Sequence, residues 1–137
     1  MLMPTLDHLG IAVKSLETAE RFYRDLGLEV QGEETIAAEK VKSAMLPLGD
    51  ARIELMEPTA EDSPVGKFLA KRGEGLHHVA LRVKDLPAIV ERMKQAGVRF
   101  ASDQIKTIDG GHAYIFVHPA SAGGVLLELC EEQPKTR

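Results

Sequence analysis

The chain has 137 residues with a net charge of −4, of which 44% are hydrophobic and 28% charged. This length suits one domain with a buried core, and the acidic balance lacks the basic footprint of a nucleic-acid-binding protein. No apolar run reaches the length of a membrane span, and the N-terminus lacks the layout of a signal peptide. Because Cys130 is the single cysteine, we expect a cytoplasmic protein without a disulfide framework.

A stretch near the N-terminus is repeated later in the chain. LDHLGIAVKSLETAERFYRDLGLEV, residues 6–30, aligns without a gap with LHHVALRVKDLPAIVERMKQAGVRF, residues 76–100. A histidine occupies the same place in each copy, His8 in the first and His78 in the second. Such a repeat indicates that one supersecondary unit is used twice.

Each copy is predicted to begin with a strand and a helix and to continue with three strands. The first helix has Ser15 as its N-cap and ends at Gly27, and the second lies between an Asp85 N-cap and Gly97. Alternating apolar residues predict strands at residues 6–13, 28–33, 41–48 and 51–57, and again at 76–83, 98–104, 113–118 and 125–130.

The order of these elements is β-α-β-β-β, twice. Module one covers about residues 5–58 and module two about residues 75–131, and the linker at 59–74 holds a short helix after Ser63. We therefore expect a single α+β domain over residues 1–137. Its two tandem βαβββ modules are expected to form an eight-stranded curved mixed sheet with the helices on the outer face.

Side-chain alternation places four polar residues on one face of this sheet. Neighbours two apart on a strand share a face, so His8 and His78 point away from the apolar, helix-packing face of their strands. A matching tripeptide near the end of each copy, Ile-Glu-Leu and then Leu-Glu-Leu, likewise leaves Glu54 and Glu128 opposite the core. Curvature of the sheet would bring these two imidazoles and two carboxylates together.

Each of these residues alone has a simpler interpretation. A histidine beside apolar residues is commonly a core residue, and a strand glutamate between leucines commonly faces solvent. Four such residues at repeat-equivalent positions with the same parity favour a shared metal site. His77 aligns with Asp7 and has the wrong parity, so we expect it to pack or bond near the start of its strand.

Three further side chains could take part in chemistry. His112 could line the mouth of a cavity, but an exposed loop position is the interpretation that we favour. His118 precedes Pro119 at a strand end and is expected to be structural. Cys130 shares parity with Glu128, and we expect it to be a small buried apolar residue.

Two imidazoles and two carboxylates are borderline-hard ligands. They suit an octahedral divalent ion such as cobalt, manganese, nickel, iron or magnesium, with two positions left for water or substrate. Zinc is compatible, but its structural sites favour cysteine and fill all four positions. Two open positions imply a bidentate oxygen ligand and Lewis-acid chemistry.

Three segments resemble the vicinal oxygen chelate superfamily, which includes glyoxalase I, extradiol dioxygenases, antibiotic-resistance binding proteins and methylmalonyl-CoA epimerase. They are LDHLGIAVKSLETAERFY, DSPVGKFLAKRGEGLHHVALRV and FVHPASAGGVLLEL, and they are most similar to the epimerase branch. The resemblance covers nearly the whole chain. The metal ligands of the family fall on His8, Glu54, His78 and Glu128, the set that the repeat selects.

The resemblance implies metal-dependent epimerisation at C2 of methylmalonyl-CoA, with R and S forms interconverting through a metal-stabilised enolate. It further implies a divalent metal cofactor, an acyl-CoA substrate and a homodimer. It assigns Glu128 the role of catalytic base as well as ligand. Ser43 stands where some epimerases carry a second carboxylate, and Glu54 stands where some have glutamine. The second acid/base is therefore open between water, Glu54 and a loop residue.

Two alternative functions share this fold. A glyoxalase I-like lyase or isomerase acting on glutathione hemithioacetals would use the same four ligands, although Ala12 stands where glyoxalase I typically has an arginine for the glutathione carboxylate. A non-catalytic small-molecule-binding protein would usually lack the full ligand set. Neither nucleic acid nor a membrane is an expected partner.

Overall fold

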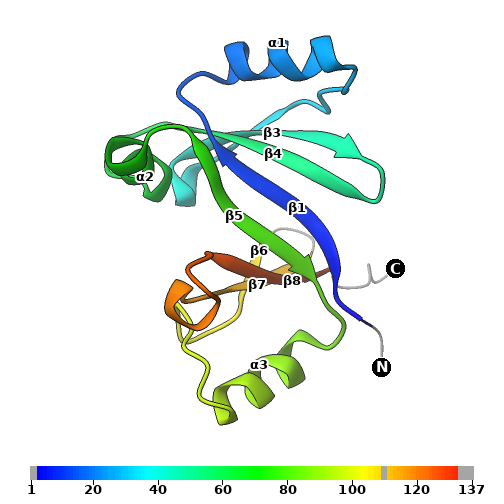
Figure 1. The fold of residues 1–137 in the computed structure, drawn as a ribbon, viewed down its shortest axis with the longest axis vertical. Coiled ribbons are helices and arrows are strands. Elements are labelled where there is room, and N and C mark those ends of the chain that lie inside the picture. Colours follow the sequence, from blue (N-terminus) through cyan, green and yellow to red (C-terminus); the bar gives the residue numbers. More distant parts are fainter. Residues whose placement is uncertain (1–2, 109–110, 133–137) are drawn as a thin grey trace. The chain divides into compact units, whose positions relative to one another are not determined.

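The computed structural model describes residues 3–108 and 111–132 of the chain. Contacts divide this part of the chain into two units, residues 8–77 and the described residues from His78 onward together with those up to Asp7. Figure 1 shows that each unit holds strands and one helix from one copy of the repeat. None of the helices in the described ranges has the length and apolar character needed to cross a membrane.

The first unit contains the linking helix and the first βαβββ module, except that the first three residues of its first strand, 5–7, belong to the other unit. Its elements are β1 (Thr5–Ala12), α1 (Leu16–Leu26), β2 (Glu33–Ile36), a 3-10 turn (Ala37–Glu39), β3 (Val41–Leu48), β4 (Ala51–Pro58) and α2 (Pro64–Arg72). The strand order is β2-β3-β4-β1, in which β1 and β4 are parallel and the other neighbours are antiparallel.

The second unit repeats this arrangement. Its elements are β5 (Gly75–Arg82), α3 (Leu86–Gln95), β6 (Lys106–Ile108), β7 (His112–Val117), a 3-10 turn (Pro119–Ser121) and β8 (Leu127–Glu132). The strand order is β5-β8-β7-β6, with β5 and β8 parallel and the other neighbours antiparallel. These are the two four-stranded halves of the eight-stranded mixed sheet, and the predicted α+β class with two βαβββ modules is confirmed.

Local signals position the two outer helices as predicted. The Ser15 hydroxyl accepts a hydrogen bond from the Thr18 amide at 3.2 Å, and the Asp85 carboxylate accepts one from the Ala88 amide at 3.4 Å. Gly27 ends α1 in the left-handed region, with φ of 109°. Side-chain capping of this kind satisfies amides that the first turn leaves without partners.

A glutamate near the end of each module's last strand ties the start of the helix to the sheet. Glu57 on β4 accepts a hydrogen bond from the Leu16 amide at 2.8 Å. Glu131 on β8 accepts hydrogen bonds from the amides of Asp85 and Leu86 at 2.7 and 2.9 Å. Negative charge at a helix N-terminus is also favoured by the helix dipole, so each contact stabilises the helix as well as its attachment.

Each unit has its own apolar core between the outer helix and the strands. In the first unit this core is built around Leu16, Ala44, Leu46 and Leu55, and in the second around Leu86, Val90, Ile115 and Leu129. The linking helix α2 differs from α1. It buries Val65 against Ala12 and Met56, which lie on the opposite face of the first unit's strands.

Two strands begin five or more residues later than the sequence predicts. The strand expected at 28–33 is β2 at Glu33–Ile36, because Leu28 and Val30 pack against the core under α1 instead of pairing along an edge. The strand expected at 98–104 is β6 at Lys106–Ile108. Phe100 packs on the core of the second unit and forms only an isolated bridge with Val117.

Candidate metal centre

The first unit brings together His8 and Glu54. His8 lies on β1 and Glu54 on β4, and their Nε2 and Oε1 atoms are 3.5 Å apart. Gly10 pairs with Glu54 in the parallel register, so His8, two residues earlier, projects to the same face as the glutamate. His8 is buried, and the side chain of Glu54 is 12% exposed.

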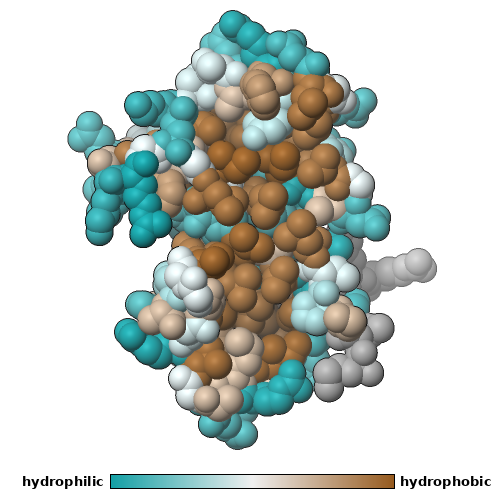
Figure 2. Space-filling model, viewed as in Figure 1, coloured by the Kyte–Doolittle hydropathy of each residue, from teal (hydrophilic) through white to brown (hydrophobic). Residues whose placement is uncertain are grey.

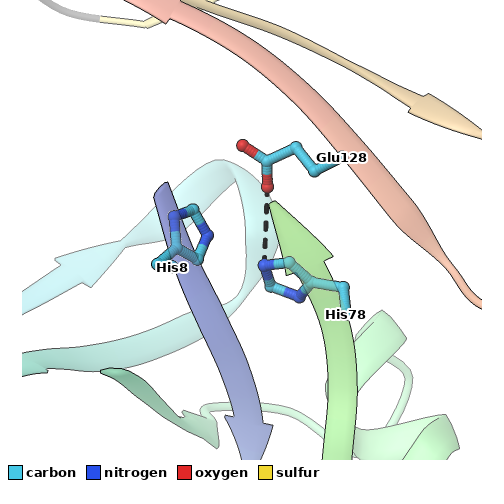
Figure 3. Close-up of side chains that lie close together, drawn as sticks. All are labelled: His8, His78 and Glu128. Atoms are coloured by element: carbon cyan, nitrogen blue, oxygen red, sulfur yellow. Dashed lines mark ion pairs between the residues drawn. The ribbon is translucent and has the colours of Figure 1, made fainter. Parts of the chain in front are cut away.

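The second unit brings together His78 and Glu128 in the same way. Nε2 of His78 on β5 lies 3.4 Å from Oε1 of Glu128 on β8, and both residues are buried. Figure 3 shows this pair joined by a dashed line, together with His8 on its own strand. Ala80 pairs with Glu128 as Gly10 pairs with Glu54, so the two pairs occupy equivalent places in the register of their units.

Small residues lie beside the two glutamates on this face. Gly10 has no side chain and Ala80 only a methyl group, and each is the register partner of one candidate ligand. The outer helices pack on the other face, where Leu55 and Leu129 belong to the apolar cores. Within each unit the imidazole and the carboxylate therefore lie on the face of the strands opposite the outer helix.

The donor atoms of each pair fit a divalent cation. Two atoms that each lie about 2.0–2.2 Å from one ion are roughly 3.0–3.5 Å apart when they are neighbours in its coordination sphere. The observed separations of 3.5 and 3.4 Å agree with this distance. Burial removes water that would otherwise solvate the carboxylates, so a cation between the two atoms would offset that loss.

His112 was expected in an exposed loop, and this prediction is wrong. The residue begins β7, and its side chain is 23% exposed. Its Nε2 lies 3.6 Å from Oε2 of Glu128, and its Nδ1 lies 2.6 Å from Oε1 of Glu132. The pKa of His112 is raised above its usual 6.5. The hydrogen bond to Glu128 is the main cause and Glu132 adds to it, while burial acts in the opposite direction.

The alternation of β7 contained the signal that would have found His112. Tyr114 and Phe116 pair with Cys130 and Glu128 on β8, and extending the pattern by one step pairs His112 with Glu132. A side chain two residues before Tyr114 must share its face if the strand continues.

The remaining expectations about single residues agree with the structure. His77 packs edge-on against Phe68, with ring centroids 5.1 Å apart, and burial lowers its pKa below 6.5. His118 caps the 3-10 turn that follows β7, since its Nδ1 accepts a hydrogen bond from the Ala120 amide at 3.0 Å. Cys130 is buried in an apolar cluster with Tyr114.

Comparison with known proteins identifies relatives over most of the chain. A model of the Glyoxalase/Bleomycin resistance protein/Dioxygenase superfamily matches residues 7–116. The mitochondrial methylmalonyl-CoA epimerase of Mus musculus is 39% identical over 126 residues, which cover 90% of this chain and 71% of the relative. The ethylmalonyl-CoA/methylmalonyl-CoA epimerase of Cereibacter sphaeroides is 37% identical over 127 residues, which cover 90% and 95%.

A solved structure is similar over almost its whole length. Methylmalonyl-CoA epimerase in complex with methylmalonyl-CoA and NH4+ gives a TM-score of 0.87 at 37% identity, covering 98% of each chain. The likeness therefore extends through both copies of the repeat and includes the strands that carry the candidate ligands.

Proposed function

Because the chain belongs to the Glyoxalase/Bleomycin resistance protein/Dioxygenase superfamily, we propose that it is an epimerase that inverts the configuration at C2 of methylmalonyl-CoA. The observation that carries this proposal is the recurrence of a His–Glu pair at equivalent register in both units. Relatives that share 37–39% of the sequence bear the names of epimerases acting on this substrate.

The four residues His8, Glu54, His78 and Glu128 are proposed to hold one divalent ion jointly. Two imidazoles and two carboxylates neutralise a divalent cation and suit cobalt, manganese, nickel or a similar ion. The repeat supports a shared ion, because each unit supplies one neutral and one anionic ligand with matching geometry. When bound, such an ion supplies Lewis acidity that stabilises negative charge on the substrate oxygens.

Glu128 is proposed to act as the base as well as a ligand. The C2 proton of methylmalonyl-CoA lies α to both a thioester carbonyl and a carboxylate, so its removal leaves a delocalised anion. Glu128 accepts this proton on one face of the substrate and can return it to the same face. Inversion requires that a proton reach C2 from the opposite face, so a second donor is needed.

Glu54 or a water molecule is proposed as the second donor. Ser43, which replaces the second carboxylate of some epimerases, is buried on β3. Met45 on the same strand pairs with Glu54, so Ser43 and Glu54 project to the same face. A serine hydroxyl is a poor acid/base beside a carboxylate, so Glu54 is the better candidate of the two.

The test is the exchange of deuterium into C2 of methylmalonyl-CoA by the metal-reconstituted protein in heavy water. We expect label in both enantiomers and interconversion of the two. A parallel assay with a glutathione hemithioacetal separates the glyoxalase I-like alternative, which would turn over that substrate instead. Absence of exchange in protein with a full metal complement would contradict the proposal.

The assembly is proposed to be a homodimer in the cytoplasm. The family precedent supports the dimer, and the single cysteine supports a reducing location. Phe22 and Leu26 on α1 are 64% and 66% exposed, and Figure 2 shows brown, hydrophobic surface beside this helix. A second copy would bury such surface. Light scattering of the purified protein tests the dimer directly.

A further inference from the structure

The second unit carries a cluster of potential metal ligands that the first unit does not repeat. His112, Glu128 and Cys130 each offer one ligand atom, and these atoms all lie within 4.8 Å of one another. They come from β7 and β8 and share one face of these paired strands, since Tyr114 is the partner of Cys130 and Phe116 the partner of Glu128. The three residues therefore converge through strand register and not through a loop.

The repeat provides an internal comparison for this cluster. Pairing between β3 and β4 matches pairing between β7 and β8, with Met45 opposite Glu54 where Phe116 is opposite Glu128. By the same register, the first unit carries Val41, Met56 and Pro58 where the second carries His112, Cys130 and Glu132. In the first unit Val41 and Met56 pack in an apolar cluster with Val65, so that unit has no counterpart of the polar set.

We propose that His112, Glu128 and Cys130 form a second cation site, one that takes a thiophilic divalent ion such as Zn²⁺ or Cd²⁺. Histidine nitrogen, carboxylate oxygen and thiolate sulfur are the ligand types of zinc sites that keep one position open. A neutral imidazole, a carboxylate and a thiolate balance the two positive charges of the ion. Charge neutrality matters here because Glu128 and Cys130 are both buried.

Glu132 prepares His112 for this role. Its Oε1 lies 2.6 Å from Nδ1 of the imidazole, a distance at which Nδ1 donates its hydrogen to the carboxylate. The lone pair then resides on Nε2, the atom that lies 3.6 Å from Oε2 of Glu128. A carboxylate that holds the far nitrogen of a ligating histidine is the common outer-shell arrangement of protein zinc sites.

The surroundings favour a soft, partly desolvated site. The His112 ring stacks on Tyr114, with centroids 5.8 Å apart, and Cys130 packs against Tyr114 and Ala80. The thiol contacts the Leu81 carbonyl oxygen at 3.6 Å, and on binding it releases its proton to solvent and bonds to the ion as thiolate. His112 is half-buried, so the remaining coordination position is open toward its side of the site.

Shared use of Glu128 links this site to the proposed function. Oε1 of Glu128 lies toward His78 and Oε2 toward His112, so one carboxylate faces two histidines. If the proposed function holds, two divalent ions would carry more positive charge than Glu54, Glu128 and Cys130 neutralise. The two ions would then compete, and Zn²⁺ would inhibit protein that is loaded with cobalt or manganese.

The test is a Cd²⁺ titration of the metal-free full chain, followed by the ultraviolet absorption of the cadmium–thiolate bond, which oxygen and nitrogen ligands do not produce. We expect one thiolate-bound ion per chain in the wild type and no such absorption in Cys130→Ser. His112→Gln should weaken the affinity for Cd²⁺ at least tenfold, whereas the matched control His118→Gln should leave it unchanged. A wild type without the absorption band, or an unchanged affinity in His112→Gln, would overturn the proposal.

A second measurement uses the unaltered protein, since replacing a buried cysteine can unfold the chain. The rate at which a thiol reagent modifies Cys130 is compared in Zn²⁺ and in Mg²⁺, and we expect it to be at least tenfold slower in Zn²⁺. Equal rates would contradict the site. Neither measurement depends on epimerisation, so a normal cadmium band without C2 exchange would contradict the proposed function alone.

Discussion

Nη1 of Arg82 lies 3.0 Å from Oδ1 of Asp7, and only 1% of the aspartate is exposed. The repeat places His77 at the position equivalent to Asp7 and Ala12 at the position equivalent to Arg82, so the equivalent positions of the other copy cannot form this ion pair. Removing the cationic partner of a buried carboxylate is costly, because the carboxylate loses part of what offsets its desolvation.

Arg82→Met should therefore lower the free energy of unfolding by about 1–3 kcal/mol, with the effect limited because the arginine side chain is 37% exposed. Urea denaturation measures the change. Arg21→Met is the matched control, since Arg21 and its partner Glu17 are 72% and 86% exposed and should change stability by less than about 0.5 kcal/mol. Equal losses in the two variants would show that the buried pair adds nothing.

Adjacent histidines at the start of β5 should behave differently. His78→Ala should abolish metal binding and epimerisation, because it removes one of the four proposed ligands. His77→Ala should keep the metal stoichiometry and lose only stability, since His77 packs on Phe68. Elemental analysis of both dialysed variants is the measurement. Equal loss of metal in both would mean that the repeat alignment assigns the wrong histidine.

Glu128→Gln should separate ligation from proton transfer. The amide oxygen still offers a ligand atom but cannot accept the C2 proton, so metal affinity should fall modestly. Epimerisation should fall by roughly 10²–10⁴-fold, the range for loss of a general base. Deuterium exchange is measured from each pure enantiomer in metal-loaded protein. Near wild-type exchange of both enantiomers would leave Glu128 as a ligand only.

Glu54→Gln is the companion variant in that experiment. Glutamine stands at this position in some members of the resembled family, so the variant should keep its metal and lose less activity than Glu128→Gln. If Glu54 serves as the second donor, exchange should slow more for one enantiomer than for the other. A loss equal to that of Glu128→Gln from both enantiomers would contradict this division of roles.

Glu20 should make stability depend on pH. It is 5% exposed, and its Oε2 has no hydrogen-bond partner among the described residues. Burial, followed by the hydrogen bond to Glu33 and the charge of that residue, raises the pKa of Glu20 above 4.5. A carboxyl whose pKa is raised on folding stabilises the fold at pH values below its unfolded-state pKa. This contribution is lost as pH rises through its folded-state pKa. At neutral pH the charged Glu20 is therefore unfavourable.

Glu20→Gln should raise the free energy of unfolding at pH 7 by about 1 kcal/mol, because the amide carries no charge and can donate to Glu33. The gain should shrink as pH falls through the raised folded-state pKa of Glu20 and should be absent below about 4.5, its unfolded-state value. The hydrogen bond with Glu20 lowers the pKa of Glu33. A lowered pKa stabilises the fold at higher pH, and this stabilisation is lost as pH falls, so Glu33 opposes the pH dependence that Glu20 produces. Thermal melts across pH measure the change, and exposed Glu17→Gln should show neither effect.

The elements that depend on local signals were predictable from the sequence. Ser15 and Asp85 carry side chains that cap a helix, and Gly27 adopts the left-handed conformation that ends α1. The pairing within each unit was predictable for a related reason. Strand alternation determines the face on which a side chain lies, and the repeat identified which histidine and which glutamate to compare.

The start of the edge strands and the position of His112 could not be predicted, because they depend on contacts between strands and not on the sequence of one strand. Leu28 and Val30 have an apolar pattern that suits a strand, but the core under α1 takes them, and pairing begins at Glu33. The position of His112 beside Glu128 follows from the register between β7 and β8. Both depend on tertiary contacts that override local preference.

The last strand of each module carries two glutamates that point to opposite faces of the sheet. One belongs to the candidate metal centre, and the other holds the outer helix. Glu54 and Glu57 are three residues apart, so the first faces the candidate metal centre while the second holds the N-terminus of α1. Glu128 and Glu131 repeat this relation with α3. A one-residue slip of either strand would exchange the two faces and displace ligand and helix attachment together. In each module a candidate ligand and a helix attachment therefore lie on one short segment of strand, so neither can be moved without the other.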